Sequence, residues 1–198
     1  NFEGSINLRG SMSQQVSVGG LYGVMEGGTR SVNNSYANAD IQINNTYSGE
    51  SAFSIAGGLV GGIGLIEQDP TSPIFNNSYA SGSINHSSTE PSNTVLLGGI
   101  AGVTTREISI NNSFSHHNIT DSQPGINGGV GGVIGALFGS DVRTYHNNYF
   151  DADKAGTTNC IIPLFDPIPG CTPISGQPGY FYNNTAKAPL DTWDFANI

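Results

Sequence analysis

The sequence predicts an all-β fold, a right-handed parallel β-helix (β-solenoid) of about four to five coils with a loop-rich, disulfide-stapled C-terminal cap. A Gly-Gly-aliphatic unit and an Asn-Asn-Ser-aromatic unit recur in fixed order along the chain, and such a repeat indicates a stacked array. Glycine makes up 28 of the 198 residues, and no segment keeps the period of an amphipathic helix. Short β-branched runs bounded by Gly, Asn, Ser and Pro are typical of strands.

The first half of the repeat supplies an aliphatic residue to the predicted core. Its cleanest copy is Gly57-Gly58-Leu59-Val60-Gly61. The third position is always aliphatic, and the two-residue period of a strand would turn it inward together with the flanking glycines. We therefore expect Leu59→Asp to unfold the array and Val60→Thr to be tolerated. The predicted aliphatic column consists of Leu21, Leu59, Ile100 and Val133.

The second half of the repeat, as in Asn76-Asn77-Ser78-Tyr79, predicts two more columns. Successive coils lie about 4.8 Å apart, so asparagine amides in line can bond one another along the stack, and the ring residues are expected in the core. A third strand is predicted at the aliphatic residues that follow, such as Ile84. The predicted aromatic column is Tyr36, Tyr79, Phe114 and Phe150, and the predicted asparagine ladder is Asn34, Asn77, Asn112 and Asn148.

The repeats define a predicted solenoid over residues 1–150 and a capping segment over residues 151–198. The repeat cores lie near 19–41, 57–84, 98–119 and 131–150. After Phe150 the pattern stops and prolines become frequent, as expected of a cap that covers the unpaired strand edges at a solenoid end. Cys160 and Cys171 have the spacing of a local disulfide and not of a common zinc site, which favours an oxidising compartment.

Composition narrows the function classes. Only 11% of the residues are charged, and the formal net charge of −9 argues against nucleic acid and anionic membranes as partners. The sequence contains no apolar run of about 18 residues, so we expect no membrane insertion, and no signal peptide is visible. The chain begins with Asn1 inside a repeat, so we expect it to be a piece of a longer protein that is secreted or displayed on the cell surface.

Few residues suggest site chemistry. Asp151 and Asp153 are a candidate for a structural Ca²⁺ site, and the alternative is a turn in which the aspartates cap backbone N–H groups. His116 and His117 are expected to face solvent at a corner. We expect no catalytic residue and no cofactor apart from this calcium, because the common hydrolase and phosphate-binding motifs are absent. Candidate stacking platforms for a carbohydrate are Tyr22, Tyr47, Tyr180 and Tyr182.

The repeated core together with the run Asn76–Ile84 closely resembles the GLUG repeat of bacterial secreted and cell-surface proteins. The resemblance covers nearly the whole chain and implies an adhesin-like protein in which the repeats are not catalytic. The expected function is an extracellular structural or adhesive module, a rigid spacer or a fibre building block with contacts borne by loops. Expected partners are other copies of itself, stacked end to end, or a host or cell-surface protein or glycan. The alternative is a carbohydrate-binding or polysaccharide-processing β-helix, such as a lyase or glycosidase.

Overall fold

The computed structural model describes residues 1–26, 30–49, 52–65, 73–90, 93–105, 107–122, 128–138, 144–162, 168–182 and 191. The fold is all-β, and its one described helix has four residues. After β1 (Phe2–Gly10) the chain makes four similar passes, which we call coils. The strands of the coils are β2 (Gln15–Gly19), β3 (Tyr22–Met25), β4 (Ser31–Asn33) and β5 (Tyr36–Asn45); β6 (Phe53–Gly57), β7 (Val60–Ile63), β8 (Ile74–Asn76) and β9 (Tyr79–Ser88); β10 (Thr94–Gly98), β11 (Ala101–Thr104), β12 (Ser109–Asn111) and β13 (Phe114–Asp121); β14 (Gly129–Gly131), β15 (Ile134–Leu137), β16 (Thr144–His146) and β17 (Asn148–Asp151). Helix α1 (Ala152–Ala155) and β18 (Cys171–Ile174) follow.

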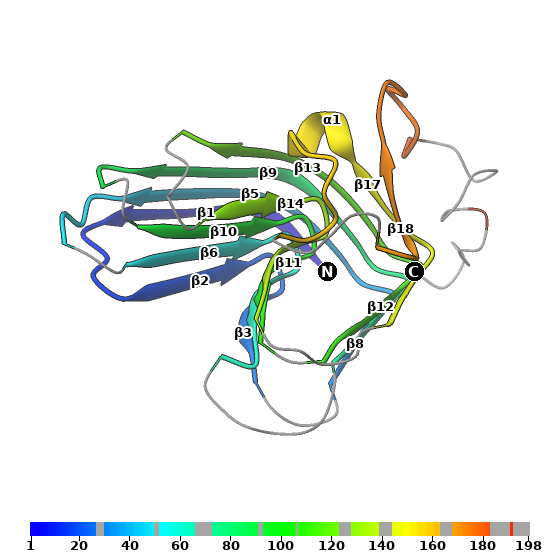
Figure 1. Ribbon diagram of the computed structural model, residues 1–198, viewed down its shortest axis with the longest axis horizontal. Helices are drawn as coiled ribbons and strands as arrows, with labels where there is room; N and C mark the ends of the chain where they lie inside the picture. The colour runs from blue at the N-terminus through cyan, green and yellow to red at the C-terminus, as the bar shows by residue number, and fades with distance from the viewer. Residues whose placement is uncertain are drawn as a thin grey trace.

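Each coil adds one strand to each of four parallel sheets, as expected for a β-solenoid. Sheet A has the order β1-β5-β9-β13-β17-β18, sheet B β14-β10-β6-β2, sheet C β15-β11-β7-β3 and sheet D β16-β12-β8-β4. Figure 1 shows equivalent strands of successive coils side by side, with sheets C and D diverging from sheets A and B. Each coil therefore has four strands and not the expected three.

The difference arises at two bends, one at the glycine pair and one at Asn77-Ser78, where a strand was expected; the predicted third strand at Ile84 is part of β9. Gly57 ends β6 and Val60 begins β7. A Cβ atom at Gly57 would lie 2.1 Å from the carbonyl oxygen of Val60 and 2.5 Å from the amide nitrogen of Gly102 in the next coil. Only glycine allows the backbone to come so close at this corner.

The aliphatic residues of the repeat form the predicted column along the stack. The amide of Leu21 donates to the carbonyl of Leu59 (2.9 Å), Leu59 donates to Ile100 (2.9 Å), and Ile100 donates to Val133 (2.8 Å). Val133 in turn donates to the carbonyl of Cys160 at 3.0 Å. The side chains of the middle coils are fully buried, whereas Leu21, on the edge coil, is partly buried.

The fourth repeat position is also buried, which contradicts the facing on which the expected tolerance of Val60→Thr depends. Val60, Ala101 and Ile134 are each 0% exposed and belong to the same core cluster as the third-position residues. The chain bends between the two positions, and the alternation of faces along a straight strand does not continue through the bend. Tyr22, on the edge strand β3, is the exception at 47% exposure.

The aromatic column contains Tyr149 in the strand register, not Phe150. Phe114 pairs with Tyr149, and Ser115 pairs with Phe150. The rings of Tyr36 and Tyr79 stack at 5.1 Å, those of Tyr79 and Phe114 at 5.0 Å. Apart from Phe114 these rings are only partly buried, so the column lies at the surface and not in the main core. Phe150 instead fills the core against Gly132, where earlier coils carry the smaller Ala37, Ala80 and Ser115.

The asparagine ladder contains Asn147 in place of Asn148. All four members, Asn34, Asn77, Asn112 and Asn147, have positive φ between 46° and 57°. Asparagine tolerates this left-handed conformation better than most residues, which suits it to the corner between sheets D and A. The amide of Asn77 donates to Oδ1 of Asn34 at 3.1 Å, and that of Asn147 to Oδ1 of Asn112 at 2.9 Å.

Asn148 belongs to a third column, in which side chains bond the backbone of the preceding coil. The Ser78 hydroxyl accepts from the amide of Ser35 (3.4 Å), and that of Ser113 accepts from the amide of Ser78 (3.2 Å). In the last coil Oδ1 of Asn148 accepts from the amide of Ser113 at 3.1 Å, and its Nδ2 donates to the carbonyl of Ile110. The side-chain amide of Asn148 thus replaces the serine hydroxyl.

The segment after Phe150 continues the stack in part. The backbone at Asn159 and Cys160 accepts hydrogen bonds from Gly132, Val133 and Ile134, and β18 pairs with β17. The expected disulfide is present and joins these two parts, with 6.3 Å between the Cα atoms of Cys160 and Cys171. The segment therefore supplies a covalently closed partial coil at this end of the solenoid.

We expect Val60→Thr to lower the free energy of unfolding by about 1–3 kcal/mol, because the new hydroxyl would lie in the apolar core without a partner. The same change at Val24, which is 37% exposed, should alter stability by no more than about 0.5 kcal/mol. Urea denaturation of both variants measures the difference. Equal losses would refute the burial of the fourth position.

The left-handed corner predicts a rank order at Asn77. Asn77→Gly should lose only the ladder hydrogen bond, about 0.5–1.5 kcal/mol. Asn77→Ala should lose a further amount of about 1 kcal/mol, because alanine is strained at positive φ. Thermal melts of the pair test the conformation, which would be contradicted if the alanine variant were as stable as the glycine variant.

Candidate functional site

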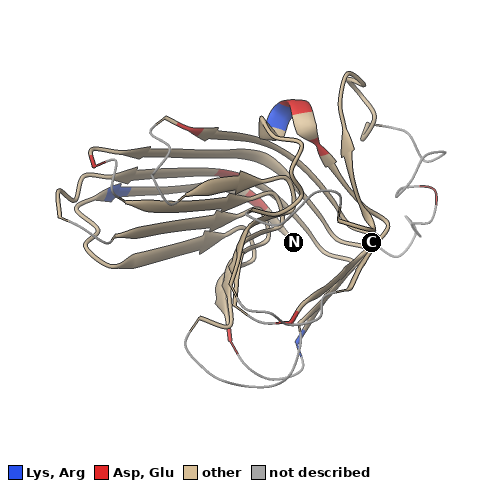
Figure 2. Cartoon of the chain, in the orientation of Figure 1, with Lys and Arg blue, Asp and Glu red and all other residues tan. Residues whose placement is uncertain are grey.

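A cleft of about 260 Å³ lies at the C-terminal end of sheet A. It is lined by His116 of β13, by residues at α1 and by the segment around Tyr182. The full lining is His116, Asp151, Asp153, Lys154, Gln177, Pro178, Gly179 and Tyr182. Figure 2 shows acidic and basic residues side by side on α1, while most of the strand length is uncharged. The cleft thus gathers charge on a molecule that has little.

His116 links the two sides of the cleft. Its Nδ1 lies 3.0 Å from Oδ2 of Asp151, and its Nε2 lies 3.0 Å from the hydroxyl of Tyr182. The Tyr182 ring stands perpendicular to the imidazole at a centroid distance of 5.0 Å. Burial and the nearby Lys154 charge lower the pKa of His116, against the opposing effect of Asp151, so that the ring is neutral at pH 7.

The two aspartates of the candidate calcium site bond different groups. Oδ1 of Asp151 accepts from the Lys154 amide at 3.0 Å, which makes Asp151 the N-cap of α1. Asp153 accepts from the Ser175 hydroxyl (2.5 Å) and the Gly176 amide (2.7 Å), and these bonds lower its pKa. In the described ranges no group of three or more His, Cys, Asp or Glu side chains is arranged for a metal ion. The capping alternative is therefore observed at Asp151, while calcium binding stays a prediction.

A row of polar side chains runs from His116 along the outer face of sheet A. The strand register aligns His116 with Ser81, Asn38 and Glu3 in successive coils. The Ser81 hydroxyl donates to Oδ1 of Asn38 at 3.2 Å. The neighbouring row behaves alike, since Ser83 donates to Asp40 at 2.8 Å. Beside the aromatic column, the outer face of sheet A thus carries hydroxyl, amide and carboxylate groups.

His117 points into the core, so the expectation that both histidines of the pair face solvent is wrong. His117 is 1% exposed and His116 is 6% exposed. The His117 ring packs against Gly58, where a Cβ atom would come within 2.4 Å of Cε1. Burial, with a smaller contribution from His116, lowers the pKa of His117 to about 3. One feature of the sequence could have indicated that His117 faces the core, namely Gly82, which pairs with His117 on the adjacent strand.

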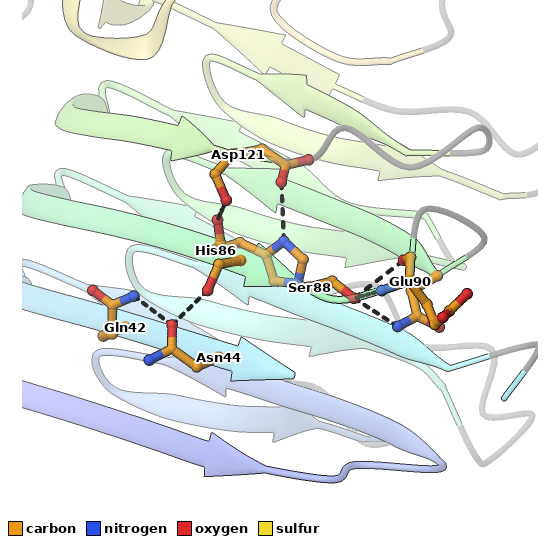
Figure 3. Close-up of polar contacts among 9 residues, drawn as sticks. Gln42, Asn44, His86, Ser88, Glu90 and Asp121 are labelled. Atoms are coloured by element: carbon orange, nitrogen blue, oxygen red, sulfur yellow. Dashed lines mark hydrogen bonds and ion pairs between the residues drawn. The ribbon is translucent and has the colours of Figure 1, made fainter. Parts of the chain in front are cut away.

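His86 forms a second buried polar cluster near the far end of sheet A. Its Nδ1 lies 3.0 Å from Oδ1 of Asp121 on the adjacent strand (Figure 3). Ser88, two residues along, accepts from the side-chain amide of Asn93 at 2.8 Å. His86 is 2% exposed, so this cluster joins coils inside the fold and offers no open site.

Of the four tyrosines considered as platforms, Tyr22 and Tyr182 are the exposed ones, at 47% and 61%. Tyr180 packs on Phe181 and Tyr149, and Tyr47 is half-buried. Tyr22 lines a cavity of about 390 Å³ at the edge formed by β3 and β4, which holds no charged side chain among its lining residues. Tyr182 is the platform that the structure combines with charged and amide groups.

Comparisons with known protein families, curated proteins and solved structures find no match to this chain. Among the described residues, no helix is long and apolar enough to cross a bilayer.

The buried His117 predicts a pH-dependent stability. The unfolded chain binds a proton at this residue below about pH 6.5, whereas the folded chain does so only near pH 3. The contribution of the buried, neutral His117 to the free energy of unfolding is therefore fully present above pH 6.5 and is lost as the pH falls towards 3. We expect His117→Leu to reduce the slope of unfolding free energy against pH by up to about 1.4 kcal/mol per pH unit between pH 6 and 4. Urea denaturation of both chains across this range measures it, and parallel curves would contradict the buried, neutral state.

Proposed function

We propose that the chain is a right-handed parallel β-helix that acts as an extracellular structural and adhesive module, either a rigid spacer or a building block of surface fibres. The observation that carries this proposal is the register, which sets like side chains on one another from coil to coil and joins them by hydrogen bonds. Stacks of this kind are rigid because each coil is held by its neighbours. The GLUG resemblance and the disulfide, which is typical of oxidising compartments, support a secreted or cell-surface location.

Self-association would use the edge formed by β1, β2, β3 and β4. Within the described strands each of these has a neighbour on one side only. The edge also exposes apolar side chains, with Tyr22 at 47% and Val24 at 37%. Unpaired strand edges are templates for pairing with another chain, so a second copy is the proposed occupant.

We propose neither a catalytic activity nor a required cofactor, and calcium at Asp151 and Asp153 stays the one candidate ion. Polysaccharide cleavage by paired carboxylates needs both groups at the scissile bond. Here the Asp151 carboxylate caps α1 and contacts His116, while that of Asp153 bonds Ser175 and Gly176. Carbohydrate binding is the second candidate function, because Tyr182 is exposed beside these polar groups. Proposed partners are thus other copies and a cell-surface protein or glycan, and not nucleic acid.

Sedimentation velocity over a wide concentration range tests the self-association. We expect concentration-dependent oligomers for the 198-residue chain and at least tenfold weaker association for Tyr22→Lys, which places a charge on the edge. Asn85→Lys is the control, because Asn85 is partly exposed on β9 and is paired on both sides, with Gln42 of β5 and Thr120 of β13, so that it lies at neither edge of the stack. A chain that stays monomeric throughout, or two variants that weaken association equally, would contradict assembly through this edge.

A further inference from the structure

We propose that the cleft between His116, α1 and Tyr182 binds one residue of a neutral saccharide, with the Tyr182 ring as the stacking platform. The inference rests on the proposed function, since it assigns the adhesive contact to a site and a ligand class. The cleft volume of about 260 Å³ suits a single sugar-sized group better than a peptide segment or a nucleotide.

The Tyr182 ring is held in place while most of its surface is open. It is 61% exposed, yet its hydroxyl lies 3.0 Å from Nε2 of His116 and its ring packs edge-on against that imidazole. Nδ1 of His116 in turn lies 3.0 Å from Oδ2 of Asp151. A tyrosine with an apolar body and an anchored polar tip offers a surface for the C–H face of a pyranose ring, with little entropy left to lose on binding.

The walls of the cleft carry the donors and acceptors that vicinal hydroxyl groups require. Lys154 and Gln177 can donate, while the carboxylates of Asp151 and Asp153 can accept. Both carboxylates are already oriented by the hydrogen bonds to Lys154, Ser175 and Gly176. Each carboxylate oxygen keeps a further lone pair, so a sugar hydroxyl could bond there without breaking these contacts.

The charge of the cleft favours a neutral ligand over an acidic one. Its lining has two carboxylates against one ammonium group. Because the pKa of His116 is lowered, its ring adds no positive charge at pH 7. The formal net charge of the whole chain is −9. Uronates, sulfated sugars and phosphates would therefore be repelled, whereas hydroxyl groups would not.

The polar row on sheet A gives the ligand a direction. His116, Ser81 and Asn38 stand in register in three successive coils, spaced by about 4.8 Å. A chain whose end residue occupies the cleft can continue along this row and meet the Ser81 hydroxyl and the Asn38 amide. Affinity should therefore rise with chain length.

The first experiment titrates the folded chain by calorimetry with neutral gluco-, xylo- and manno-oligosaccharides of one to six residues, and with oligogalacturonate as the acidic comparison. We expect binding of at least one neutral series, and at least tenfold weaker binding for Tyr182→Ala. Tyr182→Phe, which keeps the ring, should lose less, and Tyr22→Ala, the other exposed tyrosine, should bind as the wild type does. Absence of binding to all neutral series, preference for oligogalacturonate, or an unaffected Tyr182→Ala variant would each overturn the proposal.

A second measurement tests the direction and separates this site from the self-association edge. Asn38→Ala should weaken the hexasaccharide about two- to tenfold and leave the monosaccharide unchanged. Equal effects on both lengths would refute the extended row. Tyr182→Ala should sediment as the wild type does, so loss of saccharide binding with intact association would count for this cleft alone. If circular dichroism shows that Tyr182→Ala does not fold, Gln177→Ala replaces it in the binding experiment. We expect Gln177→Ala to bind the saccharide at least threefold more weakly. Unchanged binding would contradict the site.

Discussion

The structure depends on the close approach of backbone to backbone at the bend between sheets B and C. At Gly19, Gly57, Gly98 and Gly131 an added Cβ atom would lie between 1.8 and 2.3 Å from a carbonyl oxygen. No side chain fits there, so the bend stays tight and brings the third and fourth repeat positions into one core. The asparagine residues at positive φ form a second fixed corner in each coil, between sheets D and A. Between these fixed points the loops can vary in length without disturbing the stack.

Much of this scaffold could be predicted from the repeat, and the errors have identifiable causes. The file from Leu21 to Val133 follows from aligning the glycine pairs, because glycine and the aliphatic residue stand at the same corner in every coil. The alignment of the last repeat is displaced by one residue, because Asn147-Asn148-Tyr149-Phe150 matches Asn33-Asn34-Ser35-Tyr36 in its letters. The backbone conformation gives a different alignment, because Asn147 is the residue with positive φ. Asn148 takes the place of the serine and accepts the hydrogen bond from the Ser113 amide.

The candidate site was less accessible to sequence analysis. Tyr182 was one of four tyrosines with equal claim, and nothing in the repeat distinguishes it. The cleft depends on His116 reaching both Asp151 and Tyr182, which are 35 and 66 residues away in the chain. Contacts of that kind arise where the repeat ends and a non-repeating segment folds back on sheet A. Period and spacing describe the regular part of the chain and carry no information about such a junction.

The position of Cys160 has a mechanical consequence. A linear stack loosens from its outermost members, since these have a neighbour on one side only. Cys160 occupies the next place in the file of aliphatic residues, and its bond to Cys171 ties both halves of the terminal partial coil together. Unravelling under tension or proteolysis from this side of the stack therefore meets a covalent link between the two parts of the partial coil.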